Sequence, residues 1–234
     1  MRRTLALITV PACALLFLSG CGLASRGPVI SEDRSIDTAT SVVLDSWGDV
    51  TISEGEPSLV IHAPAEIMDR LTSDVKNSEL VLGVRSGIPT VSGARIRYEL
   101  TLPSLDGIRV EGAGDIRSNV PGDDLRVDIN GAGDVDIDSV DAATVTVNVS
   151  GAGDATLNGR ADELTVSLDG VGAVRAEKLR TARAIVDIAG SGDAAVFASD
   201  QLDASISGVG SVTYGGNPKV TQQISGVGEI SRRQ

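Results

Sequence analysis

The sequence predicts an all-β fold: a single-domain parallel β-helix, or solenoid, with coils of 18–20 residues, preceded by a strand-rich N-terminal part. A Gly-x-Gly motif occurs seven times, and its first glycines are 19, 20, 19, 20, 18 and 18 residues apart. Self-similarity at a fixed period near twenty is typical of solenoids. Only 2% of the residues are aromatic, which suits the narrow interior of such a fold.

The seven motifs align into columns that alternate between apolar and polar residues. Two positions before the first glycine the column is always aliphatic, as Val110 and Ile129 illustrate. Four positions after it the column again holds small or aliphatic residues, such as Ile116 and Val135. Alternation with period two indicates a strand with one buried face. Each coil is therefore expected to have one strand before and one after the glycines, with stacked strands about 4.8 Å apart.

The first and third positions of the motif are glycine in every copy. We expect these residues to form corners, because positive φ or a close approach of two backbones excludes a side chain. The predicted structural glycines are Gly112, Gly114, Gly131, Gly133, Gly151, Gly153, Gly170, Gly172, Gly190, Gly192, Gly208, Gly210, Gly226 and Gly228. An earlier segment, Trp47-Gly48-Asp49-Val50, resembles these corners and indicates that the N-terminal part caps or begins the same stack.

Residues 1–20 have the pattern of a lipoprotein signal peptide. Arg2 and Arg3 precede an apolar stretch, Leu5 to Leu18, that is too short to span a bilayer. It ends in Leu18-Ser19-Gly20-Cys21, which resembles the lipobox of bacterial lipoproteins. That resemblance implies cleavage before Cys21 and attachment of lipid, palmitate included, to its sulfur and to the new N-terminus. The alternative is an ordinary secretory signal with an incidental cysteine.

The rest of the chain divides into three parts. Residues 21–36 are predicted to be a tether, because Gly22 to Ile36 are mostly polar and lack periodicity. Residues 37–105 form the strand-rich part, and residues 106–234 hold the Gly-x-Gly repeats. In the strand-rich part we predict strands at Ser41–Leu44, Asp49–Ser53, Ser58–Ala63, Glu79–Val84 and Arg95–Leu102, one or two helical turns at Ala65–Leu71, and an exposed loop at Arg85–Ala94.

Charge and cysteine content exclude several classes of function. Removal of residues 1–20 leaves 18 basic and 32 acidic residues, a net charge of −14. A protein this acidic attracts neither nucleic acid nor anionic lipid headgroups. Membrane contact is therefore expected only through the lipid at Cys21. Because Cys13 lies in the signal peptide and Cys21 carries lipid, we expect no disulfide and no cysteine-based metal site.

A column of carboxylates is the clearest candidate site. Asp115, Asp134 and Asp154 occupy the same place in consecutive coils. Two charges about 4.8 Å apart repel by about 1 kcal/mol in water, so these groups must be solvated or hold a cation. Ca²⁺ is the foremost candidate, because hard cations prefer oxygen ligands. The alternative, which we favour, is that each Asp caps its own corner by accepting a backbone N–H.

The same carboxylates suggest catalysis, because stacked carboxylates approach the separation of about 5–5.5 Å found in retaining glycosidases. We do not expect an enzyme, since no coil visibly departs from the repeat and outward aromatic residues for stacking sugars are lacking. His62, the only histidine, is expected to be structural. Trp47, Tyr98 and Tyr214 are expected to pack rather than to recognise a ligand. The glycine motifs lack the Lys-Ser/Thr ending of a phosphate-binding loop.

Residues 37–231 resemble one family, the putative auto-transporter adhesin head, or GIN domain. The resemblance is carried by the strand-turn-strand Val42 to Ile52, by Ser73 to Leu82 and by the Gly-Ala-Gly-Asp corners. It implies a right-handed parallel β-helix in a lipoprotein or a secreted protein, and an adhesin-like role.

These observations favour a non-enzymatic binding module that is exported and lipid-anchored to the bacterial cell membrane or outer membrane. Its ligand is expected to be an unidentified polysaccharide or protein, and no cofactor other than Ca²⁺ is considered. A purely structural envelope or assembly role is the first alternative, and a polysaccharide-active enzyme is the second. The last coils, ending at Ile224 to Gln234, show no polar cap, so end-to-end self-association is also expected.

Overall fold

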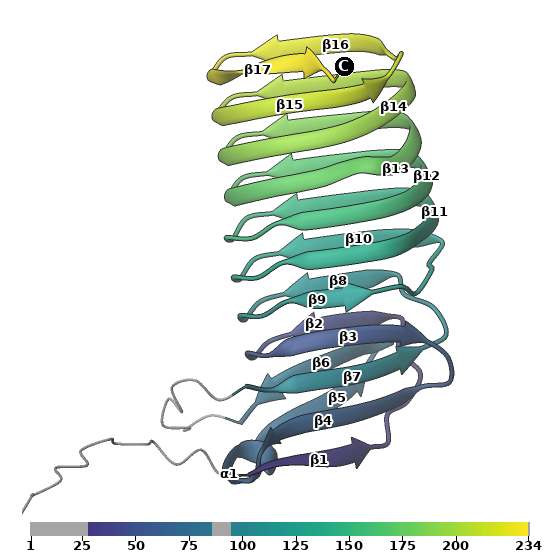
Figure 1. The fold of residues 1–234 in the computed structure, drawn as a ribbon, viewed down its shortest axis with the longest axis vertical. Helices are drawn as coiled ribbons and strands as arrows, with labels where there is room; N and C mark the ends of the chain where they lie inside the picture. The colour runs from purple at the N-terminus through teal and green to yellow at the C-terminus, as the bar shows by residue number, and fades with distance from the viewer. Residues whose placement is uncertain (1–27, 86–94, 234) are drawn as a thin grey trace, which may run out of the picture.

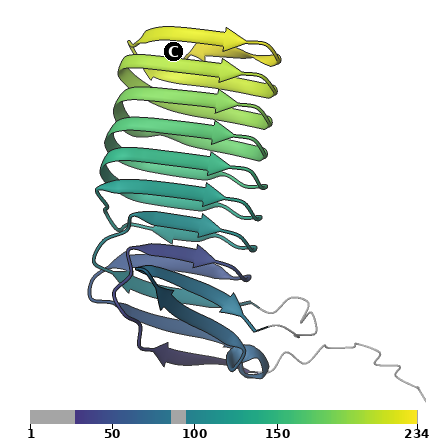
Figure 2. The same ribbon diagram turned by 180° about the vertical axis from the view of Figure 1, so that it is seen from behind.

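A computed structural model describes residues 28–85 and 95–233 and confirms the predicted all-β solenoid. The chain winds through about seven turns of about 19 residues each (Figure 1). Two sheets face each other along the stack, and the coils lie across its long axis (Figures 1 and 2). The Gly-x-Gly corners form one edge of the stack, and wider bends form the other edge.

The repeat begins with β8 (Gly107–Val110), a glycine corner and β9 (Ile116–Ser118), followed by β10 (Asp124–Ile129). From the next coil on, most strands continue around the wide bend. The remaining strands are β11 (Val135–Val149), β12 (Ala155–Leu168), β13 (Val171–Ile188), β14 (Ser191–Ile206), β15 (Val209–Gly216), β16 (Lys219–Ile224) and β17 (Val227–Arg232).

Parallel pairing places each aliphatic column in register from coil to coil. Val147 of β11 pairs with Val166 of β12, which in turn pairs with Val186 of β13. All three are at most 1% exposed. Each fully buried side chain of this kind contributes about 1.5–3 kcal/mol. The core is therefore a continuous stack of small aliphatic residues rather than one central cluster.

The N-terminal part supplies the first coil of the same stack. β2 (Ser41–Leu44) pairs in parallel with β8, β3 (Asp49–Glu54) pairs in parallel with β9, and Trp47 forms a bridge with Ala113. The similarity between the Trp47 segment and the later corners therefore reflects a true corner. After β3 the chain passes to the other side of this coil, and it resumes the repeat at β8.

The inserted segment extends both sheets beyond the first coil. It consists of β4 (Ser58–Pro64), α1 (Ala65–Met68), β5 (Leu71–Lys76), β6 (Glu79–Val84) and β7 (Arg97–Leu102). β6 and β7 continue the parallel stacking on β2 and β3, whereas β4 and β5 add antiparallel partners outside them. Tyr98 is fully buried there, with its hydroxyl 3.3 Å from Ser46 Oγ. This end of the stack is therefore closed by unique elements.

Two predicted boundaries differ from the structure. The predicted tether, residues 21–36, is wrong from Val29 on, because β1 (Val29–Arg34) pairs antiparallel with β4. Its polar sequence concealed it, since an edge strand that covers no core needs no apolar face. The helix predicted at Ala65–Leu71 is a single turn that ends at Met68. The signal peptide, Cys21 and most of the predicted loop Arg85–Ala94 lie outside the described residues.

Candidate functional site

The predicted corner glycines form two ladders in which successive coils touch through their backbones. A Cβ on Gly133 would lie 2.0 Å from Gly114 O, and one on Gly131 would lie 2.0 Å from Gly112 O. At all fourteen positions the corresponding distance to a backbone oxygen of the preceding coil is 1.7–2.2 Å. Close approach between coils therefore excludes a side chain at every one of these corners, including those without a positive φ.

The aspartate column forms a ladder of hydrogen bonds between coils. Asp115 Oδ1 accepts the N–H of Asp134 at 3.2 Å, and Asp134 Oδ1 accepts the N–H of Asp154 at 2.9 Å. Asp154 and Asp193 make the same bond to Ala173 and Ser211, at 2.7 and 2.9 Å. The prediction that each Asp caps its own corner is therefore wrong, because the donor belongs to the next coil.

The reason lies in how the corner's own donors are used. Gly133 N–H, for example, already donates to Ala152 O of the next coil at 3.1 Å, as do the equivalent corner groups elsewhere. The backbone N–H at the aspartate position of the next coil is the donor that remains within reach of each carboxylate. Each carboxylate therefore ties its own coil to the next one instead of closing its own turn.

Two arginines neutralise part of this column. Arg175 Nη1 lies 2.7 Å from Asp154 Oδ2, and this hydrogen bond raises the pKa of the Arg175 guanidinium. Arg117 Nη2 lies 3.7 Å from Asp115 Oδ2. Among the described residues, no three His, Cys, Asp or Glu side chains come together in a group that could hold a metal ion. Asp115, Asp134 and Asp154 therefore serve as hydrogen-bond acceptors between coils. This arrangement does not support the Ca²⁺ hypothesis.

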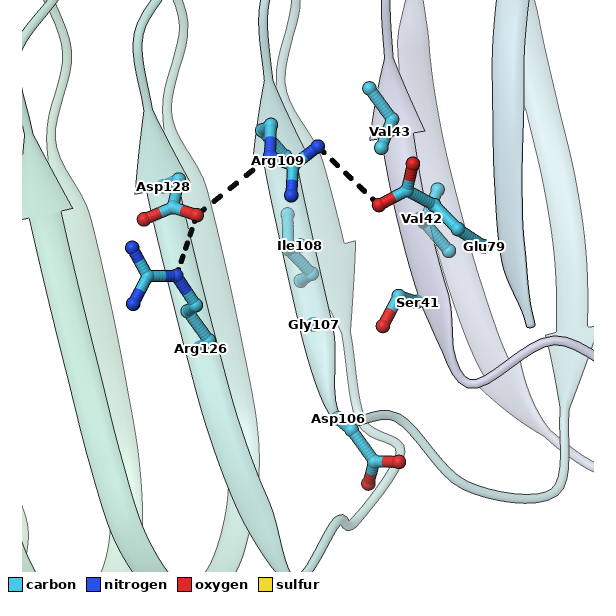
Figure 3. A pocket seen from close by; sticks show the side chains of 10 residues that line it. All are labelled: Ser41, Val42, Val43, Glu79, Asp106, Gly107, Ile108, Arg109, Arg126 and Asp128. Carbon is cyan, nitrogen blue, oxygen red and sulfur yellow. Dashed lines mark hydrogen bonds and ion pairs between the residues drawn. The ribbon is translucent and has the colours of Figure 1, made fainter. Parts of the chain in front are cut away.

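A hollow of about 130 Å³ lies on the outward face of the sheet, over β2, β8 and β10 (Figure 3). Its floor is Gly107, which stands in one column with Ser41 of β2 and Arg126 of β10. Because Gly107 has no side chain, the outward face is depressed at this point. A Cβ there would lie 2.8 Å from Ser41 Oγ and would occupy the floor.

A chain of ion pairs borders the hollow (Figure 3). Arg109 Nη1 lies 3.4 Å from Glu79 Oε2, and Arg109 Nε lies 3.8 Å from Asp128 Oδ2. Arg126 Nε donates to the same Asp128 oxygen at 2.8 Å. Asn148 Nδ2 donates to Asp128 Oδ1, also at 2.8 Å. Asp128 is only 7% exposed, so these donors compensate for the cost of burying its charge.

Several polar groups at the hollow remain available. The terminal nitrogens of Arg126, the carboxylate of Asp106 and the hydroxyl of Ser41 make no hydrogen bond or ion pair with any other described residue. Asp106 lies at one end of the hollow and Arg126 at its side (Figure 3). The Asp106 carboxylate and the Ser41 hydroxyl thus border the glycine floor, whereas the terminal nitrogens of Arg126 point away from Gly107 (Figure 3). Val43 is an apolar part of the lining.

The repeat columns did not reveal this hollow. The expectation that no coil departs from the repeat is wrong at Gly107, which replaces a residue with a side chain in an outward column. Arg126, Thr146 and Thr165 occupy that column in the next coils. The available signal was therefore a glycine outside the corner motif. Its partner on β2 was not visible, because the pairing of β2 with β8 skips a long inserted segment, and Glu79 of β6 reaches the hollow only through the pairing of β6 with β2.

The remaining candidates have structural surroundings. His62 lies on β4, with Nδ1 2.8 Å from Ser31 Oγ and Nε2 3.2 Å from Glu99 Oε1. Trp47 and Tyr214 are partly buried against the core, and Tyr98 belongs to it. At the wide bend, Arg160 binds both carboxylate oxygens of Asp141, at 2.8 and 2.7 Å. This exposed pair lowers the pKa of Asp141, chiefly through the hydrogen bond from Arg160.

Solved structures of several bacterial proteins share this fold. A putative adhesin from Bacteroides fragilis matches with a TM-score of 0.84 and 27% identity, over 88% of this chain and 97% of that one. A putative lipid binding protein from Parabacteroides distasonis matches with a TM-score of 0.70 and 18% identity, over 89% and 98%. A putative adhesin from Parabacteroides merdae has a TM-score of 0.69 and 19% identity, over 89% and 97%.

Comparison with family profiles gives a match, whereas comparison with individual curated proteins does not. No curated protein matches the chain. Within the described residues, no helix has the length and apolar character needed to cross a membrane. The profile of one family, by contrast, matches residues 40–218, which include the first coil, the inserted segment and most of the repeats. The chain therefore belongs to the family described as putative auto-transporter adhesin, head GIN domain.

Proposed function

We propose that this protein is a non-enzymatic, adhesin-like binding module that is held at the cell surface by lipid on Cys21. The observation that carries the proposal is the hollow at Gly107, where the outward face departs from the repeat and leaves polar groups unpaired. Membership of an adhesin-head family supports a binding role. Departures from a regular scaffold are where functional sites are expected.

The proposed anchor also orients the molecule. Val29, the first residue of β1, is eight residues after Cys21. An extended chain covers at most about 3.6 Å per residue, so the N-terminal end of the stack lies within about 29 Å of the lipid. The C terminus is at the opposite end of the stack (Figure 1). The coils of the repeat can therefore extend away from the membrane, with the outward sheet faces open to a ligand.

The surroundings of the carboxylates favour binding over catalysis. Glycoside hydrolysis needs one carboxyl group to give a proton and another to act as nucleophile or base. Both oxygens of Asp128 accept hydrogen bonds, from Arg126 and Asn148. In the corner column, Asp154 is engaged by Ala173 N–H and by Arg175. These carboxylates act as fixed acceptors, so we assign them to structure and positioning.

The test is to reconstitute the full processed chain in phosphatidylcholine vesicles and to add a panel of envelope and host polysaccharides, with and without Ca²⁺. We expect retention of at least one polysaccharide and no released product. Released product would contradict the proposal and favour an enzyme, and neither retention nor product would favour a structural role. Loss of polysaccharide retention in the presence of a chelator would support a Ca²⁺ site at the aspartate column.

The anchor needs a separate measurement. Cells that express the chain are labelled with radioactive palmitate and then fractionated. We expect label in the chain and recovery of the chain with membranes, and we expect Cys21→Ser to abolish both. Label that persists in the Cys21→Ser variant would contradict lipidation at this residue.

A further inference from the structure

We infer that the hollow at Gly107 holds a single neutral sugar unit of an extended polysaccharide. The inference rests on the proposed binding function and adds the chemical class of the ligand. It follows from four properties of the hollow: its size, its unpaired polar groups, its balance of charge and its position on a flat polar face.

Size limits the occupant to about one ring. The hollow measures about 130 Å³. A cavity of about 150 Å³ in another protein encloses one benzene ring, so this smaller hollow admits at most part of one sugar ring. The hollow opens to solvent on the outward face of the sheet. A ring seated in it can therefore remain linked to further sugars that lie along the face.

The unpaired groups match neighbouring hydroxyl groups. A guanidinium can only donate hydrogen bonds, an ionised carboxylate can only accept them, and a hydroxyl does both. Arg126 offers donors, Asp106 offers acceptors, and Ser41 offers either. Sugar hydroxyls each donate and accept, so a sugar can pair with groups of all three kinds. A purely anionic or purely cationic group would leave either the carboxylate or the guanidinium without a partner.

The charges argue against an acidic ligand. Two arginines, Arg109 and Arg126, stand beside three carboxylates, those of Glu79, Asp106 and Asp128, so the lining carries one net negative charge. Both arginines are already paired with Asp128, and Arg109 also lies near Glu79. The whole chain is acidic as well, with a formal net charge of −12. An acidic polysaccharide would therefore meet repulsion that a neutral one avoids.

The outward face extends the site beyond the hollow. From Arg109 and Asp128 the neighbouring column continues as Asn148, Ser167 and Asp187 on successive coils. These side chains provide further hydrogen-bonding groups at intervals of about 4.8 Å. The hollow lacks an aromatic platform, and Val43 provides its outward apolar contact. We therefore expect weak binding per site, with a Kd near 1 mM.

The experiment uses saturation-transfer NMR on the full processed chain in phosphatidylcholine vesicles. The probes are maltohexaose, cellohexaose and mannohexaose, compared with acidic hexagalacturonate and basic hexaglucosamine. We expect at least one neutral probe to bind, with the transferred signal concentrated on one ring, and we expect the charged probes to bind at least fivefold more weakly. Failure of all three neutral probes, or stronger binding of a charged probe, would overturn the inference.

Two variants test the location. Gly107→Ala places a methyl group on the floor, and its close neighbour, Ser41 Oγ, is a side-chain atom that can rotate away. Asp106→Asn removes an acceptor charge without changing shape. We expect at least tenfold weaker binding for Gly107→Ala and at least fivefold for Asp106→Asn. The matched control is Asp187→Asn, on the same face several coils away, which should change the Kd less than twofold.

The variants also separate this inference from the proposed function. If the wild-type chain retains polysaccharides and Gly107→Ala retains them equally, the protein is a binding module whose site lies elsewhere. If the wild-type chain retains nothing on the wider panel, the proposed function itself is wrong. Melting temperatures of both variants within about 3 °C of wild type would show that any loss reflects the hollow and not folding.

Discussion

The two ends of the solenoid are built in opposite ways. At the N-terminal end, the antiparallel strands β1, β4 and β5 and the helical turn α1 close the stack around large buried residues such as Tyr98 and Met68. Toward the C terminus, every coil repeats the same parallel pairing and the same glycine ladders, and the small aliphatic columns continue until Gln222 interrupts one of them in the last coil. The N-terminal end is stabilised by contacts that occur once, whereas the C-terminal coils are stabilised by the same contacts repeated from coil to coil.

This difference determines how each region responds to damage. In a repeat array each coil contacts only its neighbours, so stability is close to a sum over interfaces. A blocked corner in the middle therefore separates the coils on either side of it. At the N-terminal end a lost side chain leaves a cavity whose cost stays local. Substitutions in the two regions should therefore have different effects.

The largest effect is expected from Gly133→Val. Gly133 has φ 153° and lies where a Cβ would be 2.0 Å from Gly114 O, so the coils must separate to admit any side chain. We expect a loss of at least about 4 kcal/mol of unfolding free energy, or no folded protein at all. Thermal unfolding by circular dichroism measures this. Gly215→Ala is the control, because a Cβ there would meet only the Phe197 side chain, at 3.0 Å. Equal melting temperatures for Gly133→Val and wild type would refute the corner account.

Tyr98→Phe tests the N-terminal end and its dependence on pH. Burial raises the pKa of Tyr98 above its usual value of 10.0, partly offset by the hydrogen bond with Ser46. The folded state therefore keeps this proton at a pH where the unfolded state has lost it. This contribution is fully present below pH 10 and is lost as pH rises through the folded pKa. Removing the hydroxyl should cost about 1 kcal/mol near neutral pH.

Urea unfolding of wild type and Tyr98→Phe at several pH values measures this contribution. We expect the stability difference between the two proteins to shrink and then reverse above pH 10, because only the wild type must keep a buried phenol protonated there. A difference that stays constant across this range would mean that the Tyr98 hydroxyl is not linked to folding.

A smaller effect is expected at the C-terminal end, where the last described coil has one side uncovered. Ile224 is 44% exposed, whereas its equivalents Ile188 and Ile206, which stack against a following coil, are fully buried. We expect weak end-to-end association of the full chain through this coil. Sedimentation at rising protein concentration measures it, and Ile224→Lys should keep the chain monomeric. A chain that is monomeric throughout would exclude association.

The smallest effect is expected from Asp134→Asn. The amide oxygen of Asn can still accept the N–H of Asp154, and removal of one charge relieves repulsion from neighbouring carboxylates. We expect a melting temperature within a few degrees of wild type. Asp134→Leu, which removes the acceptor, should be less stable than Asp134→Asn. If the Asn variant unfolds instead, the charge of Asp134 has a role beyond accepting this bond.

The same contrast explains what could be predicted from the sequence. Each property of the repeat appears seven times, so the aliphatic columns and corner positions such as Gly133 stand out against random variation. Contacts that occur once have no such support. The sequence predicts a tether where the structure has the strand Val29–Arg34, because a polar edge strand has the same composition as a polar linker.

The candidate site was missed for a related reason. Gly107 is a single glycine outside the motif. Its partner Ser41 is brought beside it only because the segment between β3 and β8 packs on the opposite side of β2 and β3. The aspartates were recognised as acceptors, but local reasoning assigned them a donor in their own turn. Their actual donors belong to the next coil, nineteen or twenty residues away, in a register that local spacing does not reveal.

Strand β1 has a mechanical consequence under the proposed anchoring. The anchor would reach the domain through Val29, and β1 is held by a single antiparallel ladder with β4 and by the hydrogen bonds of Arg34 to Leu71 O and Met68 O. It lies across the long axis of the stack (Figure 1), so tension along that axis opens this ladder one pair at a time. Six released residues lengthen the linker by about 20 Å. Under the proposed anchoring, β1 would thus detach under tension before any coil of the solenoid opens.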